Sequence, residues 1–184
     1  MDIVISDRYS VYNYFDTENG QICWSHLARD FERFAHSSYV DVKYLGEYLR
    51  NIAKELFAIK KALQQEEIDI FRFLRRTKKL RKRMWYYLKT MSNKPELLQA
   101  TRMAKNMMKS DNMMWKFLDD PNNIPLTNNH VEQQIRHYVI YRKNSYFTQS
   151  IRGNEFLERI ISLYLTWKKH GFNPVQNLQN LMLA

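Results

Sequence analysis

The chain has 184 residues, of which 45% are hydrophobic, and this is enough for a folded domain with a core. Its formal net charge of +10 predicts a polyanionic partner, either nucleic acid or an anionic membrane surface. Only four glycines and four prolines argue against an all-β fold with many tight turns. No apolar run approaches the roughly 20 residues of a membrane span. The single cysteine and the absence of a signal-peptide pattern predict a cytoplasmic protein without an intrachain disulfide.

The chain opens with two strand candidates. The apolar run of residues 2–6 predicts a short buried strand that ends on Ser6 and Asp7, and residues 21–24 predict a second strand. Residues 8–15 predict a helical turn, and residues 17–20 predict a tight turn. Two short strands do not make a stable sheet alone, so a central first strand would mean that most of the sheet is missing.

The rest of the chain predicts helices, because apolar residues recur every three or four positions. We expect a strong loop at residues 119–125, a connector at 144–150, and a left-handed helix end at Gly171. The fold class is therefore mainly α with a small α/β part. The expected helices cover residues 25–35, 41–64, 66–91, 97–118, a stretch from about 128 that carries Glu132, and residues 154–170 and 174–183.

Two carboxylates stand at positions that suit metal-dependent phosphoryl transfer, which needs several carboxylates around its metal ions. Asp7 ends a buried strand, although the same residue could simply cap the following turn. Glu132 lies in the first turns of a helix, where it suits the helix dipole and could pair with Arg136. Its neighbourhood favours a larger role, since it is rich in donors suited to phosphate: Asn128, Asn129, His130, Arg136, His137, Arg142, Lys143 and Asn144.

Other chemistry has weaker support. Cys23 and His26 have the spacing of metal ligands, but no second pair of ligands follows, so a buried cysteine and a hydrogen-bonded histidine are favoured over zinc. One segment is strongly basic and runs directly into Trp85, Tyr86 and Tyr87, which predicts either phosphate-backbone contact or a solvated charged helix. Its seven basic residues are Arg75, Arg76, Lys78, Lys79, Arg81, Lys82 and Arg83.

An ordered set of motifs resembles one protein family. The set comprises S-D-R-Y-S-V-Y at 6–12, C-W-S-H-L-A-R-D-F at 23–31, I-P-L-T-N-N-H-V-E-Q-Q-I-R at 124–136, R-K-N-S at 142–145, S-x-x-G at 150–153, S-L-Y-L-T at 162–166 and H-G-F-N-P at 170–174. The chain resembles the C-terminal half of the catalytic domain of DDE-type insertion-sequence transposases, close to the insertion-sequence sixty-six family.

The resemblance implies an incomplete RNase H-like fold with a large helical insertion. By resemblance, residues 1–35 are the second-half strands of the core, 36–120 the insertion, and 121–184 the helix of the catalytic glutamate with its packing helices. Asp7 matches the second catalytic aspartate and Glu132 the final glutamate, both as ligands of Mg²⁺ or Mn²⁺. Cys23 and His26 match the C-x-x-H signature of the family.

The resemblance also implies a partner and a cellular setting. DNA is the expected partner, with phosphate contacts from Arg136, Arg142, Lys143 and the basic segment, no membrane, and a homo-oligomer on transposon ends. The setting would be the bacterial cytoplasm, at the nucleoid. Two positions depart from the family pattern: Thr127 replaces an aspartate and Gln133 replaces an arginine.

Three hypotheses follow. The first is a truncated DDE transposase whose parent activity is metal-dependent DNA cleavage and strand transfer, with this chain alone inactive because the first catalytic aspartate lies upstream. The second is a non-catalytic, basic helical module that binds DNA or RNA. The third is a degenerate transposase remnant without a function.

Overall fold

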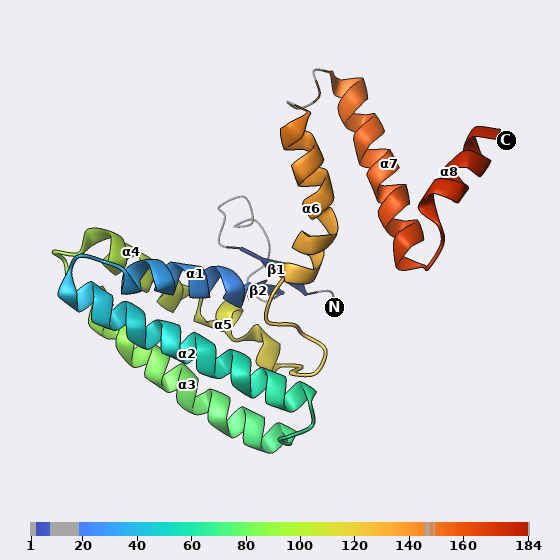
Figure 1. The fold of residues 1–184 in the computed structure, drawn as a ribbon. Helices are drawn as coiled ribbons and strands as arrows, with labels where there is room; N and C mark the ends of the chain where they lie inside the picture. The colour runs from blue at the N-terminus through green and yellow to red at the C-terminus, as the bar shows by residue number, and fades with distance from the viewer. Residues whose placement is uncertain (1–2, 8–18, 146–147, 149, 184) are drawn as a thin grey trace. The chain divides into compact units, whose positions relative to one another are not determined.

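The computed structural model describes residues 3–7, 19–145, 148 and 150–183, and the fold is mostly helical with one small sheet (Figure 1). The chain forms two compact units, Met1–Asn128 and Asn129–Ala184. The fold class of mainly helix with a small α/β part is confirmed. Among the described residues, no helix is long and apolar enough to cross a membrane.

The sheet of the first unit consists of two parallel strands, β1 (Val4–Ser6) and β2 (Gly20–Ile22). Val4 lies opposite Gly20, and Ser6 lies opposite Ile22. Both predicted strands are therefore present, but β2 ends earlier than expected because Trp24 already opens the next helix. The predicted turn at residues 8–15 lies outside the described residues, as does most of the turn at 17–20.

Four helices build most of this unit: α1 (Trp24–Ala35), α2 (Val40–Gln64), α3 (Ile70–Ser92) and α4 (Leu98–Lys109). Each packs against the next in chain order, and α2 lies beside α3 along most of its length (Figure 1). The α1–α2 crossing is close, since a Cβ atom on Gly46 would lie 2.4 Å from the backbone nitrogen of Ala35. Glycine is therefore required at this crossing.

A continuous hydrophobic core joins these helices to β2, in keeping with the apolar periodicity of the sequence. Its side chains come from every helix of the unit and from the loop before the second unit. The largest fully buried members are Trp24, Phe31, Phe73, Phe117, Leu27, Leu49, Ile52, Leu56, Ile59, Leu80, Met84 and Leu88.

The prediction that the third helix begins at residue 66 was wrong by four residues. Glu66 has a φ of 58°, in the left-handed region, so the backbone there makes a turn rather than a helix. Asp69 then caps α3, because its carboxylate accepts a hydrogen bond from the backbone N–H of Arg72 at 2.6 Å.

The single helix predicted over residues 97–118 is also wrong, since it is three elements. Helix α4 ends at Lys109, and it is followed by α5 (Asp111–Met114) and the 3₁₀ turn η2 (Lys116–Leu118). The break has a tertiary cause. The carbonyl oxygen of Met114 accepts hydrogen bonds from Trp24 Nε1 at 2.7 Å and from Gln21 Nε2 at 3.2 Å. These bonds hold the chain at β2 and α1 and favour a break over a continuous helix.

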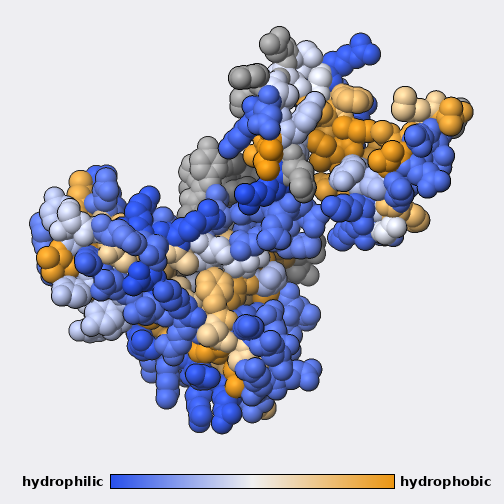
Figure 2. Space-filling view, in the orientation of Figure 1, coloured by the Kyte–Doolittle hydropathy of each residue, from blue (hydrophilic) through white to orange (hydrophobic). Residues whose placement is uncertain are grey.

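The second unit contains α6 (Asn129–Asn144), α7 (Ile151–Lys169) and α8 (Pro174–Leu183). All three predicted helices are present. Gly171 has a φ of 78° and ends α7, as expected for a residue without a side chain. Helices α7 and α8 contact each other, but none of their described side chains is buried. Hydrophobic surface accordingly gathers over α7 and α8 in Figure 2.

Candidate catalytic carboxylates and nucleic-acid surface

Asp7 directly follows β1, and its side chain is half-buried. The carbonyl of the preceding residue, Ser6, accepts a hydrogen bond from the backbone N–H of Cys23 at 2.8 Å. Ser6 is itself buried. The backbone leading into Asp7 is thus fixed to the junction between β2 and α1. This places a carboxylate at the carboxyl end of a parallel strand, where binding groups commonly gather in such sheets.

The backbone amide of Trp24, which follows that of Cys23, binds a second segment of the chain, the loop before α6. The backbone N–H of Trp24 donates to the carbonyl of Leu126 at 2.9 Å, and the side chain of Leu126 is buried. Leu126 belongs to the loop that precedes α6, and Glu132 follows six residues later in the chain. Two consecutive amides at the start of α1 therefore bind the segment that leads to Asp7 and the segment that leads toward Glu132.

Lys60 holds the same loop from the side of α2. Its Nζ donates hydrogen bonds to the carbonyl oxygens of Pro121 and Ile124, the latter at 3.3 Å, and the residue is only 5% exposed. Burial lowers the pKa of Lys60, while the nearby carboxylate of Asp120 opposes that shift. Sequence reasoning missed this residue, although Lys60 falls in register with Leu56 on the apolar stripe of the helix.

Gln21 is a second buried polar residue that the sequence reading missed. Its side chain donates to Met114, as described above, and its Oε1 accepts from the backbone N–H of Phe117 at 2.8 Å. Gln21 is 0% exposed. The amide therefore satisfies the irregular backbone between α5 and η2 and fixes it to the sheet. A polar residue within an otherwise buried strand was the available signal.

Glu132 lies in the first turn of α6 and is half-buried. It lines a shallow hollow of about 450 Å³ together with other side chains of the same helix, among them Asn129 and Arg136. The expected phosphate contacts Arg136, Arg142 and Lys143 are exposed on this helix. Glu132 belongs to the second unit, whereas Asp7 belongs to the first. Helix α6 begins at Asn129, one residue later than expected.

The C-x-x-H pair lies at the start of α1. Cys23 is buried, and His26 Nε2 lies 2.9 Å from the guanidinium of Arg29. Within the described ranges, no group of three or more His, Cys, Asp or Glu side chains is arranged to hold a metal ion.

The basic segment lies on α3, and its cations fall into two groups. Arg81 donates to the Asp111 carboxylate from Nε at 2.9 Å, and Arg83 lies 2.8 Å from Glu55. The remaining five are exposed and form no ion pair with any residue that the structure describes. They are Arg75, Arg76, Lys78, Lys79 and Lys82. Surface over α3 is mainly hydrophilic in Figure 2.

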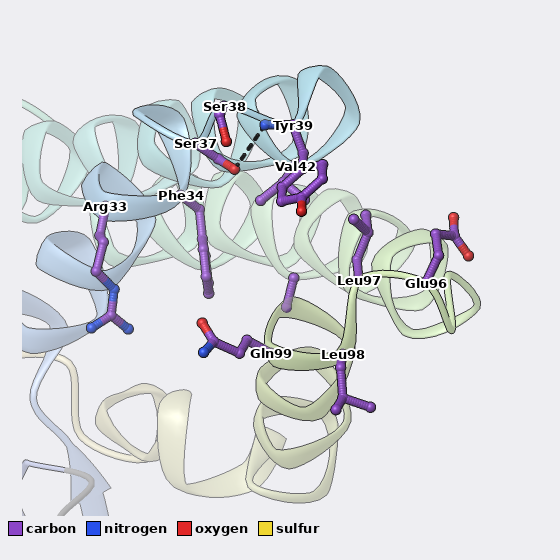
Figure 3. A pocket seen from close by; sticks show the side chains of 11 residues that line it. Arg33, Phe34, Ser37, Ser38, Tyr39, Val42, Glu96, Leu97, Leu98 and Gln99 are labelled. Carbon is purple, nitrogen blue, oxygen red and sulfur yellow. Dashed lines mark hydrogen bonds between the residues drawn. The ribbon is translucent and has the colours of Figure 1, made fainter.

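A separate hollow of about 510 Å³ opens where α1 meets the start of α2 and the start of α4 (Figure 3). Its wall mixes polar and apolar side chains, Phe34, Val42 and Leu97 among the apolar ones, and its charged residues are Arg33 and Glu96. The backbone N–H of Tyr39 donates to Ser37 Oγ at its rim. Neither predicted catalytic carboxylate lines this hollow.

Comparison with known proteins identifies the class. A family model described as "Transposase IS66 family" matches residues 2–156, which is most of the chain. The chain therefore belongs to the IS66 family of transposases. Membership of a transposase family implies DNA as the partner. A comparison with curated proteins gives no match, and a comparison with solved structures gives none either.

Proposed function

We propose that the chain supplies Asp7 and Glu132 as catalytic carboxylates for metal-dependent DNA cleavage and strand transfer in transposition. The observation that carries this proposal is the pair of amides at the start of α1. They bind the backbone next to Asp7 and the loop that leads toward Glu132. Family membership supports the reaction class.

The donor set fits a hard divalent cation. Asp7 and Glu132 offer carboxylate oxygens, which Mg²⁺ prefers and Mn²⁺ accepts. Both side chains are half-buried, so they are accessible yet partly shielded from water. When bound, two such ions activate the attacking hydroxyl and stabilise the leaving oxygen. In this proposal the core is RNase H-like, with residues 36–120 as the helical insertion.

The cations of this chain would bind the DNA backbone. Arg136, Arg142 and Lys143 lie on the helix of Glu132, so they would contact phosphates near the reacting strand. The exposed cations of α3 would add contacts that depend on salt and not on base sequence. Such a protein would act at the bacterial nucleoid, and assembly as a homo-oligomer on transposon ends stays a prediction.

The test is Mn²⁺ binding to the full chain with duplex DNA, measured by electron paramagnetic resonance. Asp7→Asn and Glu132→Gln should each weaken Mn²⁺ affinity by about tenfold or more, since even outer-shell partners of a metal matter that much. Glu158→Gln, which changes an exposed acid on α7, is the matched control and should bind like the wild type. Unchanged binding in both site variants would contradict the proposal.

A second candidate is a non-catalytic module that binds nucleic acid through α3. It is favoured by the five exposed cations without ion pairs in the described part of the chain. In that case Glu132→Gln would leave both metal and DNA binding unchanged, whereas neutralising Lys78 and Lys82 would abolish DNA binding.

A further inference from the structure

One face of α3 carries a regular row of exposed side chains. The buried residues Phe73, Leu80 and Met84 define the face of the helix that meets the core. At about 100° per residue, a second set of positions falls on the opposite face. We call this set the α3 stripe, and all its members are exposed: Phe71, Arg75, Lys78, Lys82, Tyr86 and Lys89.

The composition of the α3 stripe is two aromatic rings with cations between and beyond them. Phe71 is 81% exposed and Tyr86 is 67% exposed. They are fifteen positions apart, which is about 22 Å along a helix. Single exposed rings are common on protein surfaces, and the distinctive feature of this row is that both rings share one face with cations that form no ion pair with a described residue.

The charges of the stripe are available to an outside polyanion. Arg75, Lys78, Lys82 and Lys89 form no ion pair with any residue in the described ranges. Cations on the flanks of the helix differ, since Arg81 and Arg83 are paired with Asp111 and Glu55. The fold thus pairs two of the flanking cations of α3 and leaves every cation of the outward row without an ion pair to a described residue.

Tyr86 is held in place by other rings. Its ring centroid lies 5.6 Å from that of Tyr87, and the Tyr87 ring is stacked on Tyr48 of α2 at 4.6 Å with an interplanar angle of 10°. Tyr86 is therefore the exposed end of a row of three rings that spans two helices. Such support reduces the entropy that a ligand must remove when it stacks on the ring.

We propose that the α3 stripe binds single-stranded DNA, with its cations on successive phosphates and with unpaired bases stacked on Tyr86 and Phe71. The inference rests on the proposed function in taking DNA as the partner. A positively charged track combined with exposed aromatic rings is the arrangement that binds single strands. In a duplex the faces of the bases are already stacked on each other, so the two rings would gain no base contact.

The test is fluorescence anisotropy of the full chain with a labelled oligothymidylate long enough to span the stripe, and with a duplex of equal length. Tyr86→Ala should weaken single-strand binding by about fivefold or more, because stacking on one aromatic ring contributes about 1–3 kcal/mol per base. Duplex binding should change less than about twofold, since it depends on the phosphates. Tyr86→Trp keeps an aromatic ring at this position and should bind single strands about as well as the wild type does.

Two sets of control variants distinguish base stacking on the stripe from the effect of removing any exposed ring and from the effect of removing charge. Tyr39 is 66% exposed and lies outside the stripe, so Tyr39→Ala should bind both forms like the wild type. Lys78→Gln with Lys82→Gln should weaken both forms, whereas Lys105→Gln on α4 should have a smaller effect. Circular dichroism of each variant checks that the helices are intact.

The outcomes distinguish this inference from the function on which it rests. If Tyr86→Ala and Phe71→Ala bind single strands like the wild type, or lose single-strand and duplex binding equally, the stacking site is wrong. If the wild type binds duplex but not single-stranded DNA, the inference fails while DNA remains the partner. If the wild type binds neither form, DNA binding by this chain is refuted and the proposed function fails with it.

Discussion

The two units of this chain are stabilised in different ways. In the first unit, buried side chains form one continuous cluster that joins α1, α2, α3, α4 and β2. In the second unit, none of the described side chains of α6, α7 and α8 is buried. A similar share of apolar sequence has therefore produced a core in one unit and exposed helix faces in the other.

Local signals are what both units have in common. Ser150 caps α7, since its hydroxyl accepts from the backbone N–H of Gly153 at 3.1 Å. Asn173 accepts from the N–H of Val175 at 3.0 Å at the start of α8. Asp69 does the same for α3 in the first unit. Caps and turns therefore define where helices begin and end, whereas only burial beneath other elements makes a core.

The largest expected effect comes from a pair of phenylalanines, one in each unit. Phe31 is 0% exposed and Phe156 is 62% exposed. Phe31→Ala should lower the free energy of unfolding by about 3–5 kcal/mol, because it leaves a cavity in the core. Phe156→Ala should change it by less than about 0.5 kcal/mol. Urea denaturation followed by circular dichroism measures both.

The result for Phe156→Ala is the more informative of the two. A loss of about 2 kcal/mol or more for Phe156→Ala would mean that its ring is buried by a surface outside its own unit. The contrast between the units would then fail.

A smaller effect is expected at Lys60, which fixes the loop at the end of the first unit. Lys60→Met keeps the aliphatic bulk but leaves the carbonyls of Pro121 and Ile124 without this donor. Unfolding free energy at neutral pH should fall by about 1–3 kcal/mol, the cost of unsatisfied buried polar groups. Lys61→Met, at the exposed neighbouring position, is the control and should have little effect.

The pH dependence of this variant has a definite sign. Burial lowers the pKa of Lys60 from its ordinary value of 10.5. Between the lowered and the ordinary pKa, the unfolded chain binds more protons at this group than the folded chain does. The contribution of Lys60 to stability therefore rises with pH through that window. The difference in unfolding free energy between wild type and Lys60→Met should grow as the pH rises toward 10.5, and a constant or shrinking difference would contradict the burial of this amine.

Most helix positions could be predicted from the sequence because their signals are local. Apolar spacing predicted α1, α2, α7 and α8 closely, and Gly171 adopts the expected left-handed conformation. Those signals depend on residues within one or two turns, so no knowledge of the tertiary fold was needed.

The errors and omissions have tertiary causes. The break after α4 depends on Gln21 and Trp24, which lie 93 and 90 positions before their hydrogen-bond partner Met114. Lys60 could be placed on a buried face by spacing, but its carbonyl partners in the loop at 121–124 follow only from the fold. The prediction that Asp7 and Glu132 act in one site depends on the family resemblance, since the two residues are 125 positions apart and spacing alone does not join them.

The most direct measurement is an anomalous-difference map from crystals of the full chain bound to DNA in the presence of Mn²⁺. We expect a peak within coordination distance of carboxylate oxygens from both Asp7 and Glu132, at about 2.0–2.6 Å. That result would establish the two residues as ligands of one metal site. A map in which the carboxylates bind no common ion, or in which Mn²⁺ binds elsewhere, would contradict the proposed catalytic role.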